Sequence, residues 1–211
     1  LTPLNSQLST FNFQLSTFKH MLRNLILYFF LSSIALVVLF KFVPVPFTPL
    51  MLIRQVEARS EGCRLEIQHE WVPIEEISPE LIAAVIDEED ARFYEHSGFD
   101  WHAIRCAYQR NQRAGKIVRG GSTISQQTAK NIFCTPSRTY IRKAFEAYFT
   151  ILIEFIWGKE RIIEVYLNSI EMGDGVFGAE AAAKHYFSTS AANLNRRNAN
   201  YLAARLPNPR R

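Results

Sequence analysis

The sequence predicts a mainly α-helical protein with one N-terminal transmembrane helix. Three observations lead to this fold class. An uncharged apolar run extends from Asn24 to Phe40, apolar residues recur every three or four positions after Ser78, and no strand-rich or βαβ pattern is present. The chain has 211 residues, of which 48% are hydrophobic. This is sufficient for one domain with a core and a small accessory segment, so disorder is not expected.

Residues 1–20 look foreign to this fold. The pentapeptide QLSTF occurs at positions 7–11 and again at positions 14–18, within a stretch rich in Ser, Thr, Gln and Asn. We interpret residues 1–20 as a non-native leader, with the native start at Met21.

Residues 21–43 are expected to form a membrane anchor. Arg23 and Lys41 bracket the apolar run, and about 20 apolar residues span a bilayer as a helix. Lys19 and Arg23 before the span favour a cytoplasmic N-terminus, which places the rest of the chain outside the membrane. A cleaved signal peptide is the alternative, although no small-x-small cleavage site follows.

Residues 44–77 are interpreted as a linker that leads into the domain that follows. Its first part contains Pro44, Pro46 and Pro49 and is expected to be stiff, and the later RLEIQHEWVPI is expected to be extended. Ser78 and Pro79 then give an N-cap and a proline at the first helical position. The expected helices run from Ser78 to about Gly98, from Trp101 to Ala114, from Ser122 or Thr123 onward, from Tyr140 to Trp157, from Lys159 to Asn168 and from Ala179 to Tyr186.

The segment EDARFYEHSG, from Glu89 to Gly98, is the first candidate for chemistry. If the helix continues through it, Glu89, Phe93 and His96 share one face. The acidic run that ends at Asp90 is equally compatible with a solvated helix face. The zinc motif H-E-x-x-H is absent, which excludes that class of metalloprotease.

The segment RGGSTISQQTAKN, from Arg119 to Asn131, is the second candidate. Two glycines precede a helix start whose backbone N–H groups favour an anion. Thr123, Gln127, Lys130 and Asn131 are expected on one helical face, which suits an anionic or sugar ligand. An ordinary capped surface helix remains the alternative, and the P-loop spacing is absent.

The third candidate is the pair Arg142 and Glu146 in RKAFEAYFTILIE. A carboxylate in so apolar a helix is costly unless it is paired or catalytic, and a purely structural ion pair remains open. Lys159 to Phe187 is interpreted mostly as scaffold. Cys63, Cys106 and Cys134 form no C-x-x-C pair and are expected to be small buried thiols, with a Cys106–Cys134 disulfide as the alternative.

These segments, in this order, resemble glycosyltransferase family 51. This family comprises the monofunctional biosynthetic peptidoglycan transglycosylases and the glycosyltransferase domains of class A penicillin-binding proteins. The resemblance covers Pro79 to Pro209 and rests on EDARFYEHSG, GGSTISQQTAKN, RKAFEAYFTILIE, KERIIEVYLN and GVFGAEAAAKHYF. No penicillin-binding transpeptidase domain is visible, which points to the monofunctional type.

The resemblance implies a lysozyme-like domain over residues 78–211 with a head lobe and a membrane-facing jaw lobe. The jaw is expected around Trp101–Arg119 and Phe133–Arg142. Two departures stand out. Family members usually continue beyond the point where this chain reads LPNPRR, which implies a truncated domain, and Cys134-Thr135-Pro136 replaces residues that are usually apolar.

The resemblance also implies a reaction. Such an enzyme polymerises lipid II, an undecaprenyl-pyrophosphate-linked disaccharide-peptide, into β-1,4 glycan strands with inversion and release of undecaprenyl pyrophosphate. Glu89 is then the general base, and Lys130 and Arg142 hold the pyrophosphate. Glu146 orients those cations, binds a divalent ion or assists departure of the leaving group. The residues expected to shape the donor and acceptor pockets are Asp90, Phe93, His96, Ser122, Thr123 and Gln127.

The expected partners are the lipid-linked precursor, the growing glycan, the bacterial cytoplasmic membrane and other proteins of cell-wall synthesis and division. No tightly bound cofactor is expected, and a divalent cation, Mg²⁺ or Mn²⁺, is a candidate assistant for the pyrophosphate. Two other functions remain open: a lysozyme-like lytic enzyme that cleaves glycan, and a non-catalytic scaffold for cell-wall assembly. The net charge of +4 is the one feature that favours nucleic acid, and it is too small to support that function.

Overall fold

The computed structural model describes residues 2–116, 120–137 and 139–210, with side chains described from residue 14 onward. The chain divides into two units, residues 1–40 and residues 41–211, and each is described by itself. Arg119, which ends the expected jaw segment Trp101–Arg119, lies outside the described residues. Arg211, the last residue of the expected domain, also lies outside them.

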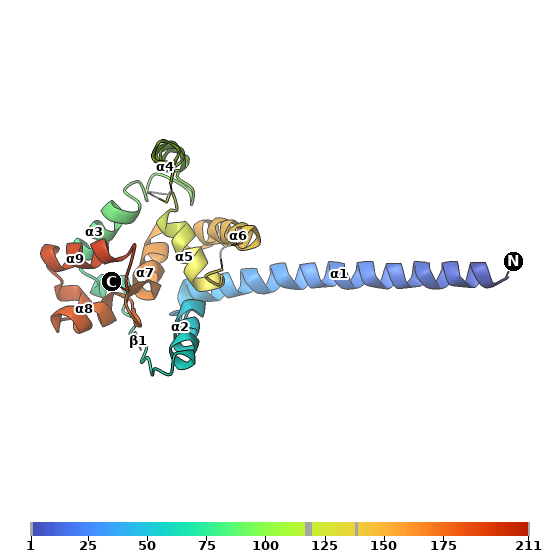
Figure 1. Cartoon of the computed structure of the whole chain (residues 1–211), viewed down its shortest axis with the longest axis horizontal. Coiled ribbons are helices and arrows are strands. Elements are labelled where there is room, and N and C mark those ends of the chain that lie inside the picture. Colours follow the sequence, from blue (N-terminus) through green and yellow to red (C-terminus); the bar gives the residue numbers. More distant parts are fainter. Residues whose placement is uncertain (1, 117–119, 138, 211) are drawn as a thin grey trace. The chain divides into compact units, whose positions relative to one another are not determined.

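The first unit is formed by helix α1 (Thr2–Phe42), which continues two residues beyond it (Figure 1). Within α1, Gln14–Phe42 is long and apolar enough to cross a membrane, by length and composition alone. It contains the anchor expected at residues 21–43, and a signal sequence would meet the same criteria.

The second unit is mainly helical. Its elements in chain order are α2 (Pro49–Ser60), β1 (Gln68–His69), the short 3₁₀ helix η1 (Ile74–Glu76), α3 (Pro79–Glu89), α4 (Trp101–Ala114), α5 (Ile124–Phe133), α6 (Tyr140–Ile156), α7 (Lys159–Ser169), β2 (Glu171–Gly173), β3 (Val176–Phe177), α8 (Ala179–Phe187), η2 (Ala191–Asn193) and α9 (Arg196–Arg205). The prediction of a mainly α fold is confirmed.

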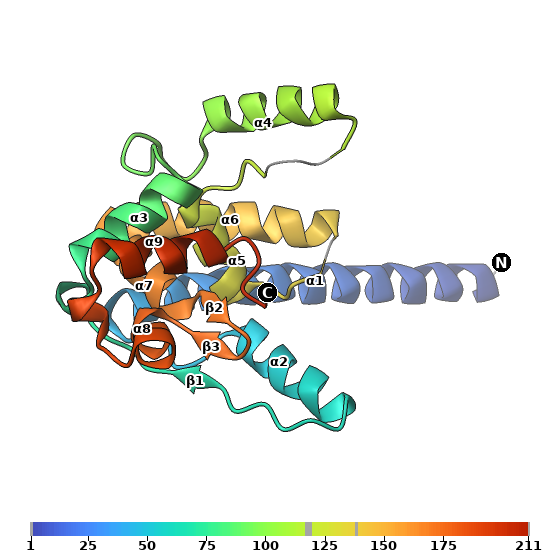
Figure 2. The ribbon, with the colours of Figure 1, turned by 60° about the vertical axis from the view of Figure 1, so that its left-hand side comes forward.

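Helix α5 lies at the centre of this unit, between α6 and α7. Its buried residues include both apolar side chains, such as Ile124 and Ala129, and polar ones, such as Ser125 and Asn131. Helix α3 packs on α9 at the other side of the core, and Figure 2 shows α4 apart from the other helices of residues 41–211. Of the residues in α4, Ala107 is buried.

A small sheet in the order β1-β3-β2 closes the unit beside α8. Strand β1 is parallel to β3, with Gln68 opposite Val176, and β2 is antiparallel to β3. Gly178 follows β3 with φ +85°, and a Cβ there would lie 2.7 Å from the carbonyl oxygen of Asn168. A side chain is therefore excluded where this turn passes the end of α7.

The segment interpreted as a linker and entry segment, residues 44–77, contains a helix that was not predicted. Helix α2 begins directly after Thr48, whose hydroxyl accepts a hydrogen bond from the Met51 amide at 3.3 Å, and Pro49 occupies the first helical position. Proline is favoured at that position because its missing N–H has no partner there in any case. The extended structure predicted for RLEIQHEWVPI is confirmed at β1, whereas α2 and α9 were not predicted.

Helix α3 ends at Glu89 and not near Gly98 as predicted. The Asp90 amide still donates to the Ile86 carbonyl at 2.9 Å, but the φ and ψ angles of Asp90, −158° and 69°, leave the helix. Turns follow, such as the bond from the Phe93 amide to the Asp90 carbonyl at 2.8 Å. Glu89, Phe93 and His96 are therefore not on one helical face, and that prediction is wrong.

Candidate active site

Glu89 is the last residue of α3 and lines a cavity of about 220 Å³. Its carboxylate accepts a hydrogen bond from the side-chain amide of Gln127 at 2.6 Å. Gln127 accepts in turn from the Tyr166 hydroxyl at 3.2 Å. Burial raises the pKa of Tyr166 well above its usual value, and the charges of Glu89 and Asp90 add to this, so the phenol stays protonated and donates. This chain of bonds orients the amide N–H of Gln127 toward Glu89.

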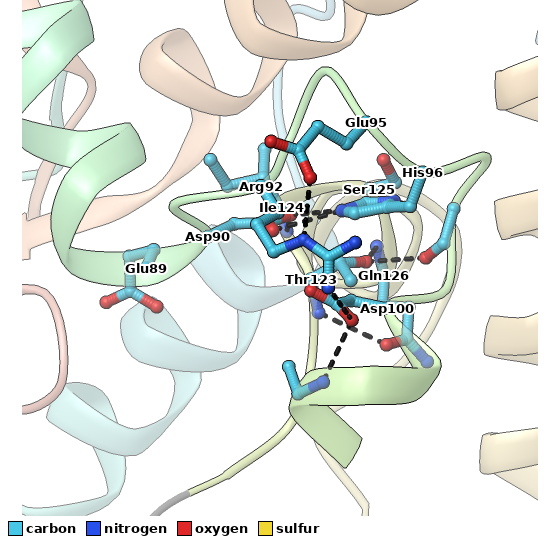
Figure 3. Close-up of polar contacts among 12 residues, drawn as sticks. Glu89, Asp90, Arg92, Glu95, His96, Asp100, Thr123, Ile124, Ser125 and Gln126 are labelled. Carbon is cyan, nitrogen blue, oxygen red and sulfur yellow. Dashed lines mark hydrogen bonds and ion pairs between the residues drawn. The ribbon is translucent and has the colours of Figure 1, made fainter. Parts of the chain in front are cut away.

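Asp90 faces a different set of partners. Its carboxylate accepts from the Ile124 amide at 3.0 Å and from Nε2 of His96 at 3.0 Å. The Nδ1 atom of His96 is buried and has no hydrogen-bond partner among the described residues. Figure 3 shows the carboxylate of Glu89 pointing away from this cluster. Asp90 and His96 thus hold the segment that follows Glu89 against the start of α5.

The loop before α4 is fixed by a second set of contacts. The Thr123 hydroxyl donates to the Gly98 carbonyl at 2.6 Å, and Thr123 also caps α5 by accepting from the Gln126 amide at 3.2 Å. Gly98 has φ +90°, and a Cβ there would lie 2.9 Å from Cγ2 of Thr150. Phe93 is fully buried, with Nζ of Lys159 4.5 Å from its ring centroid.

A second cavity, of about 320 Å³, lies at the other end of α5. Lys130 and Arg142 both line it. Glu146 is 2% exposed and accepts hydrogen bonds from Arg142 and Lys143, one on each oxygen. Burial lowers the pKa of Lys130, while the charges of Glu146 and Glu89 act in the opposite direction. The carboxylates of both candidate regions therefore influence the pKa of Lys130.

The predicted site residues fall into three groups. Glu89 and Gln127 are in direct contact, and Ser122 is exposed at the wall of the same cavity. The second group lies at the second cavity, which is lined by the cations Lys130 and Arg142. Glu146 belongs to this group because its carboxylate accepts from Arg142. The remaining side chains make internal contacts that position the loop, as described above for Asp90, Phe93, His96 and Thr123.

Sequence reasoning missed two residues here, Tyr166 and Arg54. Tyr166 lies in a block interpreted as scaffold, although its place in KERIIEVYLN was a signal that it belongs to the site. Asn131 was expected on the face of α5 that suits an anionic or sugar ligand, and it lines the second cavity. Arg54 lines the second cavity from α2, and nothing in the local sequence singles it out because its partner, Glu171, is 117 positions away.

The cysteines are free in the described part of the chain. Cys134 is buried, as predicted, whereas Cys63 and Cys106 are exposed, which was not. The alternative of a Cys106–Cys134 disulfide is therefore wrong. No group of three or more His, Cys, Asp or Glu side chains suited to a metal ion occurs among the described residues.

The sequence was also compared with known protein families and with known proteins. A family model described as "Transglycosylase" matches residues 57–211, which begin within α2 and extend through α9. The chain belongs to the transglycosylase family. The match includes every predicted site residue and also Tyr166, but not Arg54.

Relatives of this transglycosylase chain come from several bacteria. A "Biosynthetic peptidoglycan transglycosylase" of Pseudomonas fluorescens (strain SBW25) is 54% identical over 193 residues, which cover 92% of this chain and 80% of the relative. Proteins with the same name in Caulobacter vibrioides and Bdellovibrio bacteriovorus are 52% and 55% identical, over 90% and 88% of this chain and 82% and 74% of their own length.

Proposed function

We propose that this protein is a peptidoglycan glycosyltransferase that polymerises a disaccharide carried on a polyprenyl pyrophosphate. The observation that carries the proposal is the connection between its two charged regions. Gln127 holds Glu89, and Lys130 lies about one helical turn further along α5, with Arg142 at the same cavity. The family membership and the names of the relatives support the same reaction class.

Glu89 is proposed to act as the general base. The acceptor sugar must lose the proton of its 4-hydroxyl as that oxygen attacks the anomeric carbon of the donor. The bond between acceptor oxygen and anomeric carbon forms on the face opposite the breaking carbon–phosphate oxygen bond, so the configuration inverts. Glu89 takes the hydroxyl proton. A positioned base of this kind contributes typically 10²–10⁴-fold in rate.

Lys130 and Arg142 are proposed to receive the departing pyrophosphate. A pyrophosphate leaves without being protonated when cations compensate its charge, so no general acid is required at this end. Both oxygens of Glu146 already accept bonds from Arg142 and Lys143. Of the three roles considered for Glu146, this arrangement favours orientation of the cations. A divalent cation remains a candidate that assists at the phosphate groups without residing in the protein.

The apolar helix within α1 is proposed to anchor the enzyme in the cytoplasmic membrane, with the catalytic domain on the outer side. The excess of positive charge before the span supports this orientation. An anchored domain also suits a donor and an acceptor that are both held in the bilayer by their lipid tails.

The test is turnover of fluorescent lipid-linked disaccharide-peptide by the detergent-solubilised full chain, with and without a chelator. We expect glycan polymers and free polyprenyl pyrophosphate. Digestion of purified sacculi without consumption of the precursor would instead identify a lytic enzyme. Inactivity in both assays, with normal cell-wall assembly in cells that carry Glu89→Gln, would favour a scaffold.

A further inference from the structure

Tyr166 places a hydroxyl inside the core of the second unit. It lies on α7 and is the largest fully buried side chain among the described residues. A buried phenol needs a hydrogen-bond partner for its hydroxyl, whereas phenylalanine would fill nearly the same space without that requirement. Packing alone therefore does not account for the hydroxyl of Tyr166, and its bonding partner indicates what the hydroxyl does.

Helix α7, which carries Tyr166, is held firmly on its other side. Asn168 follows two positions later, so it projects from a different face of the helix, and it is fully buried. Its side-chain oxygen accepts from the Val72 amide, and its side-chain nitrogen donates to the Val72 carbonyl, both at 2.9 Å. The Asn168 carbonyl also accepts from Nε2 of His69 at 3.0 Å. These bonds fix α7 to residues 69–72, so Tyr166 is presented to α5 from a fixed support.

The hydroxyl of Tyr166 holds one end of the Gln127 amide, and Glu89 holds the other. A carboxylate only accepts hydrogen bonds, so the amide must turn its nitrogen toward Glu89, at 2.6 Å. Its oxygen then faces Tyr166, whose hydroxyl donates to it at 3.2 Å. A glutamine side chain has several rotatable bonds, and a bond at each end of its amide restricts them together.

The direction of the Glu89 carboxylate depends on contacts of this kind. Glu89 is the last residue of α3, and the bonds of Asp90 hold the backbone that follows it. Figure 3 shows the Glu89 carboxylate pointing away from the cluster around Asp90. That cluster therefore fixes the backbone beside the candidate base, and the bond from Gln127 directs its side chain.

We propose that Tyr166 is a positioning residue for the general base: its hydroxyl fixes the Gln127 amide, which directs the carboxylate of Glu89. This inference rests on the proposed function, because Tyr166 acts only through Glu89 and is itself too deeply buried to touch the substrate. A displacement of about 1 Å in a reacting group can cost about 10²-fold in rate, so the loss of one positioning bond should have a smaller but measurable effect.

The experiment measures turnover of fluorescent lipid-linked disaccharide-peptide by the detergent-solubilised full chain. Tyr166→Phe removes the hydroxyl and keeps the ring. We expect kcat to fall by about 5- to 20-fold and KM to stay within about twofold, because the base is misdirected while the binding surfaces are kept. Wild-type kcat in this variant would overturn the inference.

Tyr186→Phe is the matched control. It also removes a hydroxyl that donates a hydrogen bond, to the Met172 carbonyl at 3.5 Å, and none of the described lining residues of the two cavities lies on its helix, α8. We expect wild-type kinetics. An equal fall in kcat in Tyr186→Phe and Tyr166→Phe would assign the effect to stability and would also overturn the inference.

Gln127→Met tests whether Tyr166 acts through Gln127. It keeps most of the volume and removes the amide, so we expect Tyr166→Phe to lower kcat no further when it is added to Gln127→Met. A purely structural role of Tyr166 predicts instead that the two reductions multiply, and that result would count against the positioning role. If Tyr166→Phe fails to fold, Gln127→Met alone decides the matter, because wild-type kcat in that variant would show that the connection does not direct Glu89.

A spectroscopic measurement separates this inference from the proposed function. In ¹⁵N-labelled full chain, the side-chain amide signal of Gln127 is assigned by its loss in Gln127→Met, and we expect it to shift in Tyr166→Phe and not in Tyr186→Phe. If that shift is seen but the wild type consumes no precursor, the positioning stands and the proposed reaction fails. If the wild type polymerises and Tyr166→Phe changes neither kcat nor the signal, the reaction stands and this inference fails.

Discussion

The two ends of helix α5 differ in how their polar groups are satisfied. At the N-terminal end, bonds within the protein hold the segment after Glu89, with Asp90 accepting from Ile124 and Thr123 donating to Gly98, although Nδ1 of His96 has no partner among the described residues. At the C-terminal end, Asn131 and Arg142 present donors without a partner among the described residues. A base must keep one direction through the reaction, so fixing it internally is useful. A leaving-group site needs donors whose acceptor is the substrate, and unpaired donors meet that need.

The largest expected effect is on Glu89, where the comparison predicts loss of chemistry without loss of structure. Glu89→Gln keeps the volume of the side chain and removes the base. We expect polymerisation of the lipid-linked precursor to fall by about 10²–10⁴-fold. The thermal midpoint and pyrophosphate binding should not change. Glu88→Gln, one position earlier and exposed, is the matched control, and wild-type rates in Glu89→Gln would remove this residue from the reaction.

The second effect concerns the thiols near the two ends of the helix. Cys106 is exposed and lines the cavity of Glu89, whereas Cys134 is buried and lines the cavity of Lys130. Burial raises the pKa of the Cys134 thiol from 9.0 to about 11. Because the thiolate is the reactive form, this shift lowers the reactive fraction of Cys134 at pH 8 by about 100-fold and slows its alkylation.

Mass spectrometry of tryptic peptides after timed alkylation with iodoacetamide measures this difference. Cys63 and Cys106 should be modified first in the native protein, and all three cysteines should react at similar rates in urea. Rapid native modification of Cys134 would show that the wall of the second cavity opens to solvent, which would contradict the burial of this thiol.

The third effect is on the free energy of unfolding and concerns Asp90, which lies at the N-terminal end of α5. Asp90→Asn preserves shape but removes the charge from a buried carboxylate that accepts from His96 and from the Ile124 amide. Charge-assisted bonds of this kind are worth more than neutral ones, so we expect a loss of about 1–3 kcal/mol in the free energy of unfolding. Denaturation in urea measures it. Asp87→Asn, on the exposed face of α3, should change stability by less than about 0.5 kcal/mol. An equally stable Asp90→Asn would refute the positioning role.

The difference between the two ends also explains what sequence could predict. The starts of α4, α5 and α6 were predicted to within about two residues because their caps are local: Asp100, Thr123 and Thr139 each accept from an amide within three positions. The end of α3 was not predictable in this way. The partners of Asp90 that stop the helix include Ile124, which is 34 positions away.

The same reasoning applies to the site. Glu89, Gln127, Lys130 and Arg142 were named because their motifs resemble a family, and the structure brings Glu89 to Gln127 and Lys130 to Arg142. Arg54 was not named because the salt bridge to Glu171 that fixes it joins residues distant in sequence. The unpaired state of Asn131 is likewise a property of three-dimensional packing, which no local pattern records.

The smallest expected effect is the stability change on removing the Lys130 charge. Burial lowers the pKa of Lys130, so the unfolded chain holds this proton more tightly than the folded protein does. A charged Lys130 is therefore a net cost to folding at neutral pH. Between the lowered pKa and the ordinary value of 10.5, the unfolded state binds more protons, so the free energy of unfolding of the wild type rises with pH.

Lys130→Met removes the charge and retains most of the volume. We expect a free energy of unfolding at pH 7 that equals or exceeds that of the wild type, together with loss of pyrophosphate binding. The rise in stability with pH should be smaller in this variant. Exposed Lys116→Met is the control and should leave both quantities unchanged. If Lys130→Met is instead destabilised by more than about 2 kcal/mol, the attraction between Lys130 and Glu146 outweighs the cost of burial, and Lys130 is held there for the fold and not for a ligand.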